Sequence, residues 1–272
     1  MYTRIIRVEY EKGGDYVILA FIGDPHIGST TFDLDRYMEA INAIKGLAKQ
    51  AKTYWFGMGD WAHAIAPHPA EKRFDFDSLD PDLMTPDKQY AKAEETLRLL
   101  TGQQNLDCAV LLTGNHDDVL RSRHYHDFVA TMAHNLNVEY GGINAAINFI
   151  FERGKHHSQL GIYVNHGCGN CNAIGAKIKK ITDATQTIEA DVYAMGHVHQ
   201  VLYLPRPKLI VDSEGKIRQI EQHFVLTGSF QRGYPAGATA DYIEKRMLNP
   251  VKLGGIAFRF WPETRKFEML EI

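Results

Sequence analysis

The sequence predicts a mixed α/β fold, and three features of its pattern support that class. Short apolar runs alternate with segments of helical periodicity through the first half of the 272-residue chain. The second half is richer in short strand-like runs separated by turn residues. Hydrophobic residues make up 44% of the chain, so a chain of this length can bury a full core without disulfides. We expect a βαβ core with a second sheet packed on it.

In the first half, strands with polar C-terminal ends are expected at 16–24, 53–60 and 106–118. Apolar residues at helical spacing predict helices at 37–48, 85–100 and 125–136. The second of these helices opens with Thr85 as N-cap and Pro86 at the first helical position, a strong start signal. The polar, proline-punctuated region 62–88 is hard to assign and is predicted to be a surface loop or lid.

In the second half, strands are expected within 145–167, 190–200, 201–205, 208–220, 223–229 and 255–272. Turn residues predict hairpins at 213–215 and 262–264, and residues 171–181 suit a helix. The chain contains no internal repeat, low-complexity segment or clear linker. We therefore expect a single domain over residues 1–272.

Charge and cysteine content restrict the possible partners and compartment. The formal net charge is −3, so no global positive field attracts a polyanion, and contact with nucleic acid would need a local patch. Three cysteines fit a reducing compartment better than a disulfide framework. The apolar run 17–22 is too short to cross a membrane. A cytoplasmic protein without membrane partners is expected, and its 13 histidines suggest metal or phosphate chemistry.

Polar residues end five of the strand-like runs. They are Asp24 and His26, Asp60, the run Asn115, His116 and Asp117, then His166, and finally His197 and His199. Ligands of open α/β sheets bind at the carboxyl ends of the strands, so these tips are expected to converge. Any one of them is more often a turn than a ligand, but five in order are very unlikely by chance.

The side chains at these tips suit metal binding. Two aspartates, one asparagine and four histidines give seven oxygen and nitrogen ligands. That donor set fits manganese, iron or zinc, and it fits two ions that share a bridging carboxylate. Within each x-spaced pair, an extended tip would point residues i and i+2 to the same side.

The ordered motifs resemble the signature blocks of the calcineurin-like metallophosphoesterases. The blocks are GDPH at 23–26, GD at 59–60, GNHD at 114–117, NHG at 165–167 and GHVH at 196–199. Two further stretches, 190–200 and 225–235, are similar to phosphoesterases of phages and prophages. The resemblance implies a four-layer α/β/β/α sandwich with a dinuclear metal site between its sheets.

The resemblance also implies a role for each block residue. Asp24, His26 and His199 would hold the first ion, and Asp60 would bridge. The second ion would be held by Asn115, His166 and His197. His116 would contact the phosphoryl group or the leaving oxygen.

Two positions depart from the family pattern. Many members have an aspartate three residues after the bridging aspartate, where it can pair with the catalytic histidine, and this chain has His63 there. The carboxylate partner of His116 is therefore open, with Asp117 or a residue elsewhere as candidates. The fourth block usually reads Gly-His, and Asn165 replaces that glycine while His166 remains.

The implied activity is hydrolysis of phosphate esters with two divalent ions, of which Mn²⁺ is expected first and Fe or Zn are alternatives. Asp60 and His116 are the expected catalytic residues: hydroxide near Asp60 attacks phosphorus, and His116 protonates the leaving group. A phosphodiesterase or nuclease acting on DNA, RNA or nucleotides is the first interpretation. A phosphomonoesterase, including a protein phosphatase, and a metal-bound scaffold without turnover are the alternatives.

Substrate contacts are expected from Arg121, His63 and Asp117. Arg121 follows the GNHDD tip, where its guanidinium could bind phosphate oxygens or could simply lie in a solvated loop that enters a helix. Cys168 and Cys171 form a C-x-x-C next to His166. No second ligand pair for a structural zinc is evident, so two reduced cysteines in a turn are expected.

Overall fold

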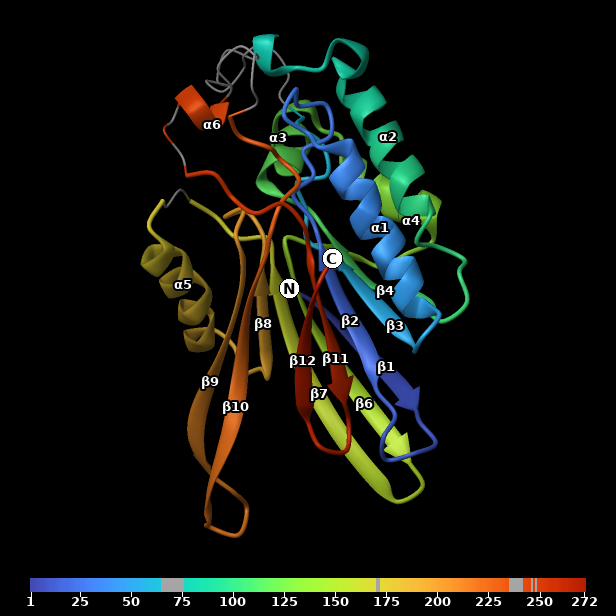
Figure 1. The fold of residues 1–272 in the computed structure, drawn as a ribbon, viewed down its shortest axis with the longest axis vertical. Coiled ribbons are helices and arrows are strands. Elements are labelled where there is room, and N and C mark those ends of the chain that lie inside the picture. The colour runs from blue at the N-terminus through green and yellow to red at the C-terminus, as the bar shows by residue number, and fades with distance from the viewer. Residues whose placement is uncertain (65–75, 170–171, 235–241, 246, 248) are drawn as a thin grey trace.

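The computed structural model describes residues 1–64, 76–169, 172–234, 242–245, 247 and 249–272. It contains two six-stranded sheets with helices on their outer faces, which confirms the mixed α/β class (Figure 1). In the described part of the chain, no helix is both long and apolar enough to cross a membrane.

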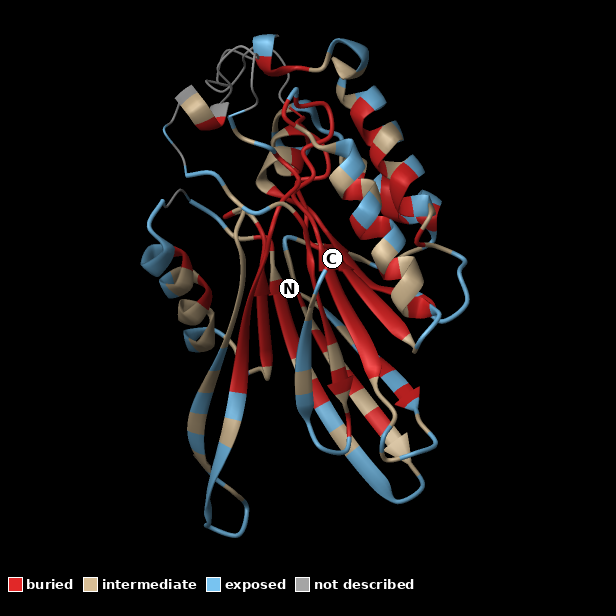
Figure 2. Ribbon diagram, viewed as in Figure 1, coloured by how far each residue is buried: buried red, intermediate tan, exposed pale blue. Residues whose placement is uncertain are grey.

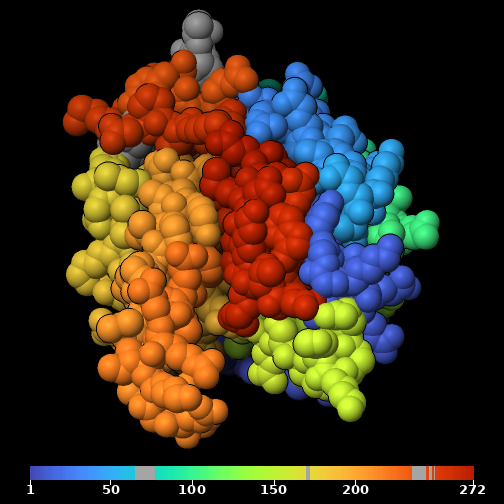
Figure 3. All heavy atoms as spheres, turned by 60° about the horizontal axis from the view of Figure 1, so that its bottom comes forward, coloured from blue at the N-terminus to red at the C-terminus, as the bar shows by residue number. Residues whose placement is uncertain are grey.

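One sheet has the strand order β12-β11-β2-β3-β4-β5. Its strands are β2 (Val17–Ile22), β3 (Thr53–Gly57), β4 (Leu106–Leu112), β5 (Tyr140–Gly142), β11 (Ile256–Trp261) and β12 (Lys266–Glu271). Strands β2 to β5 are parallel, and β11 runs antiparallel to β2. The strands of opposite chain ends thus lie side by side, as the red and blue surfaces in Figure 3 show.

The other sheet has the order β1-β6-β7-β8-β10-β9. Its strands are β1 (Tyr2–Glu9), β6 (Asn144–Arg153), β7 (His156–Asn165), β8 (Val192–Met195), β9 (Val201–Val211) and β10 (Ile217–Thr227). The hairpins expected at 213–215 and 262–264 are confirmed. Strand β9 continues through Pro205 and Pro207, which an edge strand tolerates because its outer N–H positions need no partner.

The helices are α1 (Leu34–Ala48), α2 (Pro86–Arg98), α3 (Asn115–His124), α4 (Phe128–Leu136), α5 (Ile174–Asp183) and the short α6 (Tyr242–Lys245). Single turns of 3-10 helix lie at Phe76–Ser78, Pro81–Leu83 and Ala184–Gln186. The expected helices at 37–48, 85–100, 125–136 and 171–181 correspond to α1, α2, α4 and α5. Helix α1 begins because the Asp33 carboxylate accepts a hydrogen bond from the Arg36 N–H.

The hydrophobic core explains why β2 reads as an unbroken apolar run. All six of its residues are buried, and alternate side chains point to opposite faces. Val17, Leu19 and Phe21 join a cluster shared by both sheets. Ile18 and Ala20 join a second cluster, under α1, α2 and α4. Figure 2 shows this buried centre, with exposed residues at the far ends of the long hairpins and on the helices.

The sequence pattern missed the strands β1 and β5 and the helices α3 and α6. Strand β1 buries only Ile6 and Val8 fully, and exposed charged residues interrupt its apolar pattern. Helix α3 buries only Asp117 and Leu120, so it has no apolar stripe at helical spacing. The strand expected over 106–118 ends at Leu112, because the polar residues from Asn115 onward form the first turn of α3.

Part of the expected loop or lid at 62–88 is described. His63 and Ala64 are buried, and Pro86 already begins α2. Residues 65–75 lie outside the described part of the chain.

Candidate metal centre

The candidate site lies where the carboxyl ends of strands from both sheets meet. Asp24 and His26 follow β2, Asp60 follows β3, and His116 belongs to the first turn of α3 after β4. The other sheet contributes His166 after β7, and His197 and His199 after β8. These elements converge near α3 in Figure 1. The structure therefore brings together the five polar tips that the sequence pattern singled out.

A first group of possible metal ligands contains Asp24, His26 and His199. One ligand atom from each lies within 4.8 Å of the others. The Nε2 atoms of His26 and His199 are 3.0 Å apart, and His199 Nε2 lies 3.5 Å from Asp24 Oδ1. Asp24 and His26 are buried.

A second group contains Asp60, His166 and His197, again with one ligand atom from each within 4.8 Å. His166 Nε2 lies 3.3 Å from Asp60 Oδ2 and 3.1 Å from Asn115 Oδ1. The same Asp60 Oδ2 lies 3.6 Å from His26 Nε2 of the first group. Asp60 is thus the carboxylate between the two groups.

The backbone at these tips is left-handed, which corrects the extended-tip explanation for the x-spaced pairs. Positive φ values occur at Asp24 (52°), His26 (50°), Asp60 (51°), His197 (65°) and His199 (50°). For non-glycine residues this region costs of order 1–3 kcal/mol each and is concentrated at functional sites. Five such residues in one cluster indicate that the fold stabilises an arrangement that local propensity opposes.

Hydrogen bonds between the tips hold this backbone in place. The Asp24 carboxylate accepts a bond from the His197 N–H at 3.0 Å, and Asp60 Oδ1 accepts one from the His116 N–H at 2.8 Å. The Asp24 carbonyl accepts bonds from the Ser229 hydroxyl at 2.9 Å and from the Phe230 N–H at 3.2 Å. Asp24 and Asp60 are therefore tied to loops from other parts of the chain.

Carbonyl groups orient two of the histidines. His166 Nδ1 lies 2.7 Å from the Met58 carbonyl, and His197 Nε2 lies 2.7 Å from the Gly169 carbonyl. A ring N–H donated to a carbonyl places the lone pair on the opposite nitrogen, as metal-binding histidines require. These backbone partners leave no signal in the sequence.

The electrostatics pair Asp60 with His166. Burial disfavours the imidazolium, but the Asp60 carboxylate outweighs this and raises the pKa of His166 to about 10. Burial would also raise the pKa of Asp60, yet His166 and His116 hold that pKa well below its usual range. Burial and the neighbouring His116 lower the pKa of His26 well below its ordinary value. Asp60 is therefore ionised, and the proton on His166 balances its charge. A bound metal ion can balance that charge in place of the proton.

His116 takes its orientation from a backbone group. Its Nδ1 lies 2.7 Å from the carbonyl oxygen of His63, at the position where a carboxylate was expected. Asp117 bonds elsewhere, to the Tyr90 hydroxyl at 2.5 Å and the Gly114 N–H at 2.8 Å. Burial and the nearby Asp60 raise the pKa of Asp117 to about 7. Asp117 thus holds the turn that positions His116.

The other expected site residues lie further out. Arg121 is half-exposed on α3, and its Nη2 lies 2.6 Å from Asp118 Oδ1. Among the described contacts, none joins Arg121 to the two ligand groups. Cys168 is exposed, and Cys171 lies outside the described residues.

Comparisons with known proteins add little. No protein-family model matches the chain, and no curated protein matches it. One similar solved structure is that of a conserved uncharacterised protein, a predicted phosphoesterase, from Streptococcus pneumoniae TIGR4. The two chains are 12% identical, and the match covers 95% of this chain and 99% of the other with a TM-score of 0.33. At this level, the match supports no conclusion about fold or activity.

Proposed function

We propose that this protein is a metal-dependent phosphoesterase that uses two divalent ions, with Mn²⁺ as the first candidate. The observation that carries the proposal is the position of Asp60, whose Oδ2 lies within 3.6 Å of histidines from both ligand groups. One carboxylate shared by two such groups is the arrangement a dinuclear centre needs. The proposal includes one domain over residues 1–272 with the four-layer α/β/β/α sandwich of the calcineurin-like enzymes.

The residues present fit a pair of divalent ions. Both groups combine carboxylate oxygen with imidazole nitrogen, and Asn115 adds an amide oxygen to the second group. This donor set suits manganese, iron and zinc. The first ion would be held by Asp24, His26 and His199. The second would be held by Asn115, His166 and His197, with Asp60 shared.

The ions, when bound, would activate water for attack on phosphorus and neutralise charge on the phosphoryl oxygens. The chain's own contribution is the placement of His116. Its Nδ1 proton is donated to the His63 carbonyl, so its Nε2 can exchange a proton with the substrate. The rings of His116 and His26 lie 4.6 Å apart, which places this general acid beside the first ligand group.

The substrate class we propose is a phosphodiester, in nucleic acid or a nucleotide. Support comes from the resemblance of the ordered motifs, including the phage-type stretches, and from the intact set of expected ligands. The net charge of −3 means that binding of a long polyanion would depend on a local surface. Phosphomonoesterase activity, or metal binding without turnover, are the other outcomes of the test.

The test is an activity panel on metal-free protein reconstituted with Mn²⁺. The substrates are bis-p-nitrophenyl phosphate, p-nitrophenyl phosphate, cyclic nucleotides, and single- and double-stranded DNA. We expect diester hydrolysis that EDTA abolishes, and two ions per chain by elemental analysis. The variant Asp60→Asn should lose both ions, whereas His134→Asn, an exposed histidine on α4, should lose neither.

Three results would contradict the proposal. One ion or none in fully reconstituted protein would remove the dinuclear centre. Two bound ions without hydrolysis of any substrate in the panel would favour the scaffold alternative, and activity on the monoester alone would favour a phosphomonoesterase.

A further inference from the structure

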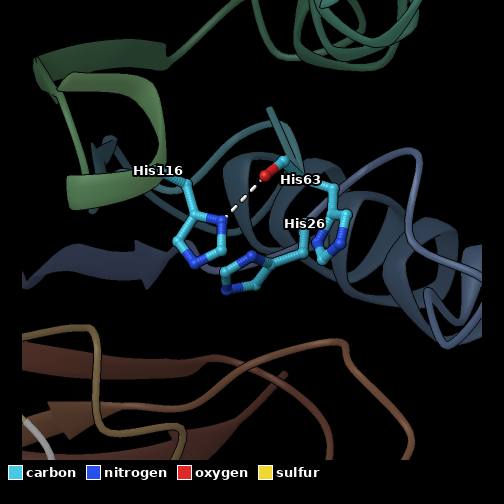
Figure 4. Close-up of side chains that lie close together, drawn as sticks. All are labelled: His26, His63 and His116. Carbon is cyan, nitrogen blue, oxygen red and sulfur yellow. Dashed lines mark hydrogen bonds between the residues drawn. The ribbon is translucent and has the colours of Figure 1, made fainter. Parts of the chain in front are cut away.

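A third group of possible metal ligands, drawn in Figure 4, consists of three histidines and shares His26 with the first ligand group. His26, His63 and His116 each offer a ring nitrogen within 4.8 Å of the others. The centroid of the His116 ring lies 4.6 Å from that of His26 and 5.7 Å from that of His63. His26 and His63 are buried and His116 is half-buried. Three imidazoles therefore face one another with little solvent between them.

One nitrogen in this group is buried without a partner. His26 Nε2 faces His199 in the first ligand group, whereas His26 Nδ1 has no hydrogen-bond partner among the described residues. His26 is only 2% exposed, so water does not replace the missing partner freely. A buried polar atom without a partner costs about 1–3 kcal/mol, which a ligand at this atom would remove.

The neighbouring rings are already oriented by other groups. The bond from His116 Nδ1 to the His63 carbonyl leaves the lone pair of His116 on Nε2. The Ser78 hydroxyl lies 3.3 Å from His63 Nε2, which fixes that ring on the side opposite Nδ1. The rings of His116 and His63 are therefore held in one orientation before any ligand binds.

The chemistry of this group differs from that of the two ligand groups, since it contains no carboxylate. Nitrogen ligands suit Zn²⁺, Ni²⁺ and Cu²⁺, whereas Mn²⁺ and Mg²⁺ favour oxygen. Three histidines also leave a fourth, open position on a tetrahedral zinc ion.

We propose that His26, His63 and His116 form a separate zinc site whose occupation excludes the ion held by Asp24, His26 and His199. The exclusion follows because a neutral imidazole has one lone pair, so His26 can serve one ion or the other.

Zinc binding at this site would affect the proposed enzyme activity. Only that effect rests on the proposed function. Zinc bound here removes His26 from the first ion and occupies the nitrogen with which His116 would protonate a leaving group. We therefore expect zinc to inhibit the Mn²⁺-loaded enzyme. The binding claim itself does not require that the protein be an enzyme.

The direct test isolates the three-histidine group in the double variant Asp24→Asn/Asp60→Asn. Asparagine keeps oxygen acceptors for the His197 and His116 N–H groups while removing the negative charges of both metal groups. Co²⁺, a spectroscopic substitute for zinc, is titrated and its visible absorption recorded. We expect one ion per chain with the intense absorption of tetrahedral coordination.

Adding His63→Asn to this double variant should weaken Co²⁺ binding by more than about 100-fold, beyond the loss caused by changing an outer partner of a ligand. The matched control is His134→Asn in the same background, which should leave the titration unchanged. Equal Co²⁺ affinity with and without His63 would overturn the proposal.

A second measurement covers the case in which the double variant does not fold. Native-sequence protein loaded with Mn²⁺ is titrated with Zn²⁺, and both metals are counted after gel filtration. We expect one zinc to enter and one manganese to leave, and His63→Asn to need a far higher zinc concentration. If zinc replaces both manganese ions to the same extent in the native-sequence protein and in His63→Asn, the metals have simply exchanged. That result would show that no separate zinc site exists.

Discussion

Replacing Gly114 by alanine should disrupt the centre through a single contact. Gly114 has φ −92° and ψ 177°, a conformation open to any residue, so alanine strains no backbone there. A Cβ at this position, however, would lie 2.0 Å from Asp60 Oδ1 and 2.2 Å from the Asp60 backbone nitrogen. The substitution therefore tests the close approach of two loops and nothing else.

The size of the effect follows from these distances. Non-bonded atoms prefer separations of about 3.5 Å, so Asp60 or the α3 turn must move by about 1 Å or more. Overpacking costs about 1–3 kcal/mol, and losing the bond from the His116 N–H to the Asp60 carboxylate costs about 1.5–3 kcal/mol. We expect the free energy of unfolding to fall by about 2.5–6 kcal/mol. Because Asp60 is the carboxylate shared by the two ligand groups, the affinity for Mn²⁺ should fall by about 100-fold or more.

Guanidinium unfolding of the metal-free protein and Mn²⁺ titration by calorimetry measure the two effects separately. The control is Gly46→Ala in α1, where an added Cβ meets no atom within 4 Å. That helix-interior change should stabilise the protein by about 0.5–1 kcal/mol and leave Mn²⁺ binding unchanged. If Gly114→Ala has the unfolding free energy and Mn²⁺ affinity of the parent chain, the packing argument for this turn is wrong.

Three further substitutions test other parts of the structure. His116→Ala should keep both ions but lose roughly 10²–10⁴ in turnover, with larger losses on nucleoside diesters than on p-nitrophenyl esters, because an activated nitrophenolate needs little protonation. Steady-state kinetics with metal analysis measures this, and loss of an ion would make His116 a ligand. Burial and Arg265 lower the pKa of His223 to about 4, so its neutral form stabilises the fold above its unfolded pKa near 6.5. That contribution, up to about 3 kcal/mol, should disappear as pH falls from 6.5 to 4. His223→Gln should therefore flatten this part of the stability–pH curve, and an unchanged slope by denaturant unfolding would contradict the assignment. Cys168→Ser should retain both ions, since the two ligand groups contain no thiolate; a lower metal count in folded protein would refute this.

Much of the fold could be predicted because the relevant signals are local. Apolar runs such as Val17–Ile22 end in polar residues, and the runs that form β2, β3 and β8 are buried at every residue. Elements whose burial depends on distant partners were missed. Strand β1 pairs with β6, more than a hundred residues away, and the N-cap of α3, Gly114, packs against Asp60 from another loop.

The residue types at the strand ends, and their order, can be read directly from the amino-acid sequence. Asp24, Asp60 and the histidines of the later tips were identified from spacing and chemistry, without any coordinates. Those features are local, because a strand ends where its apolar run ends.

How these residues meet could be seen only in the folded chain. It gave Asp24 and His199 left-handed backbones in place of extended ones, and it placed Asp60 between two histidine groups. It also assigned the orientation of His116 to the carbonyl of His63, although the family pattern suggested a carboxylate. The physical reason is that a backbone carbonyl is present at every residue, and which one faces an imidazole depends on contacts between loops far apart in the chain.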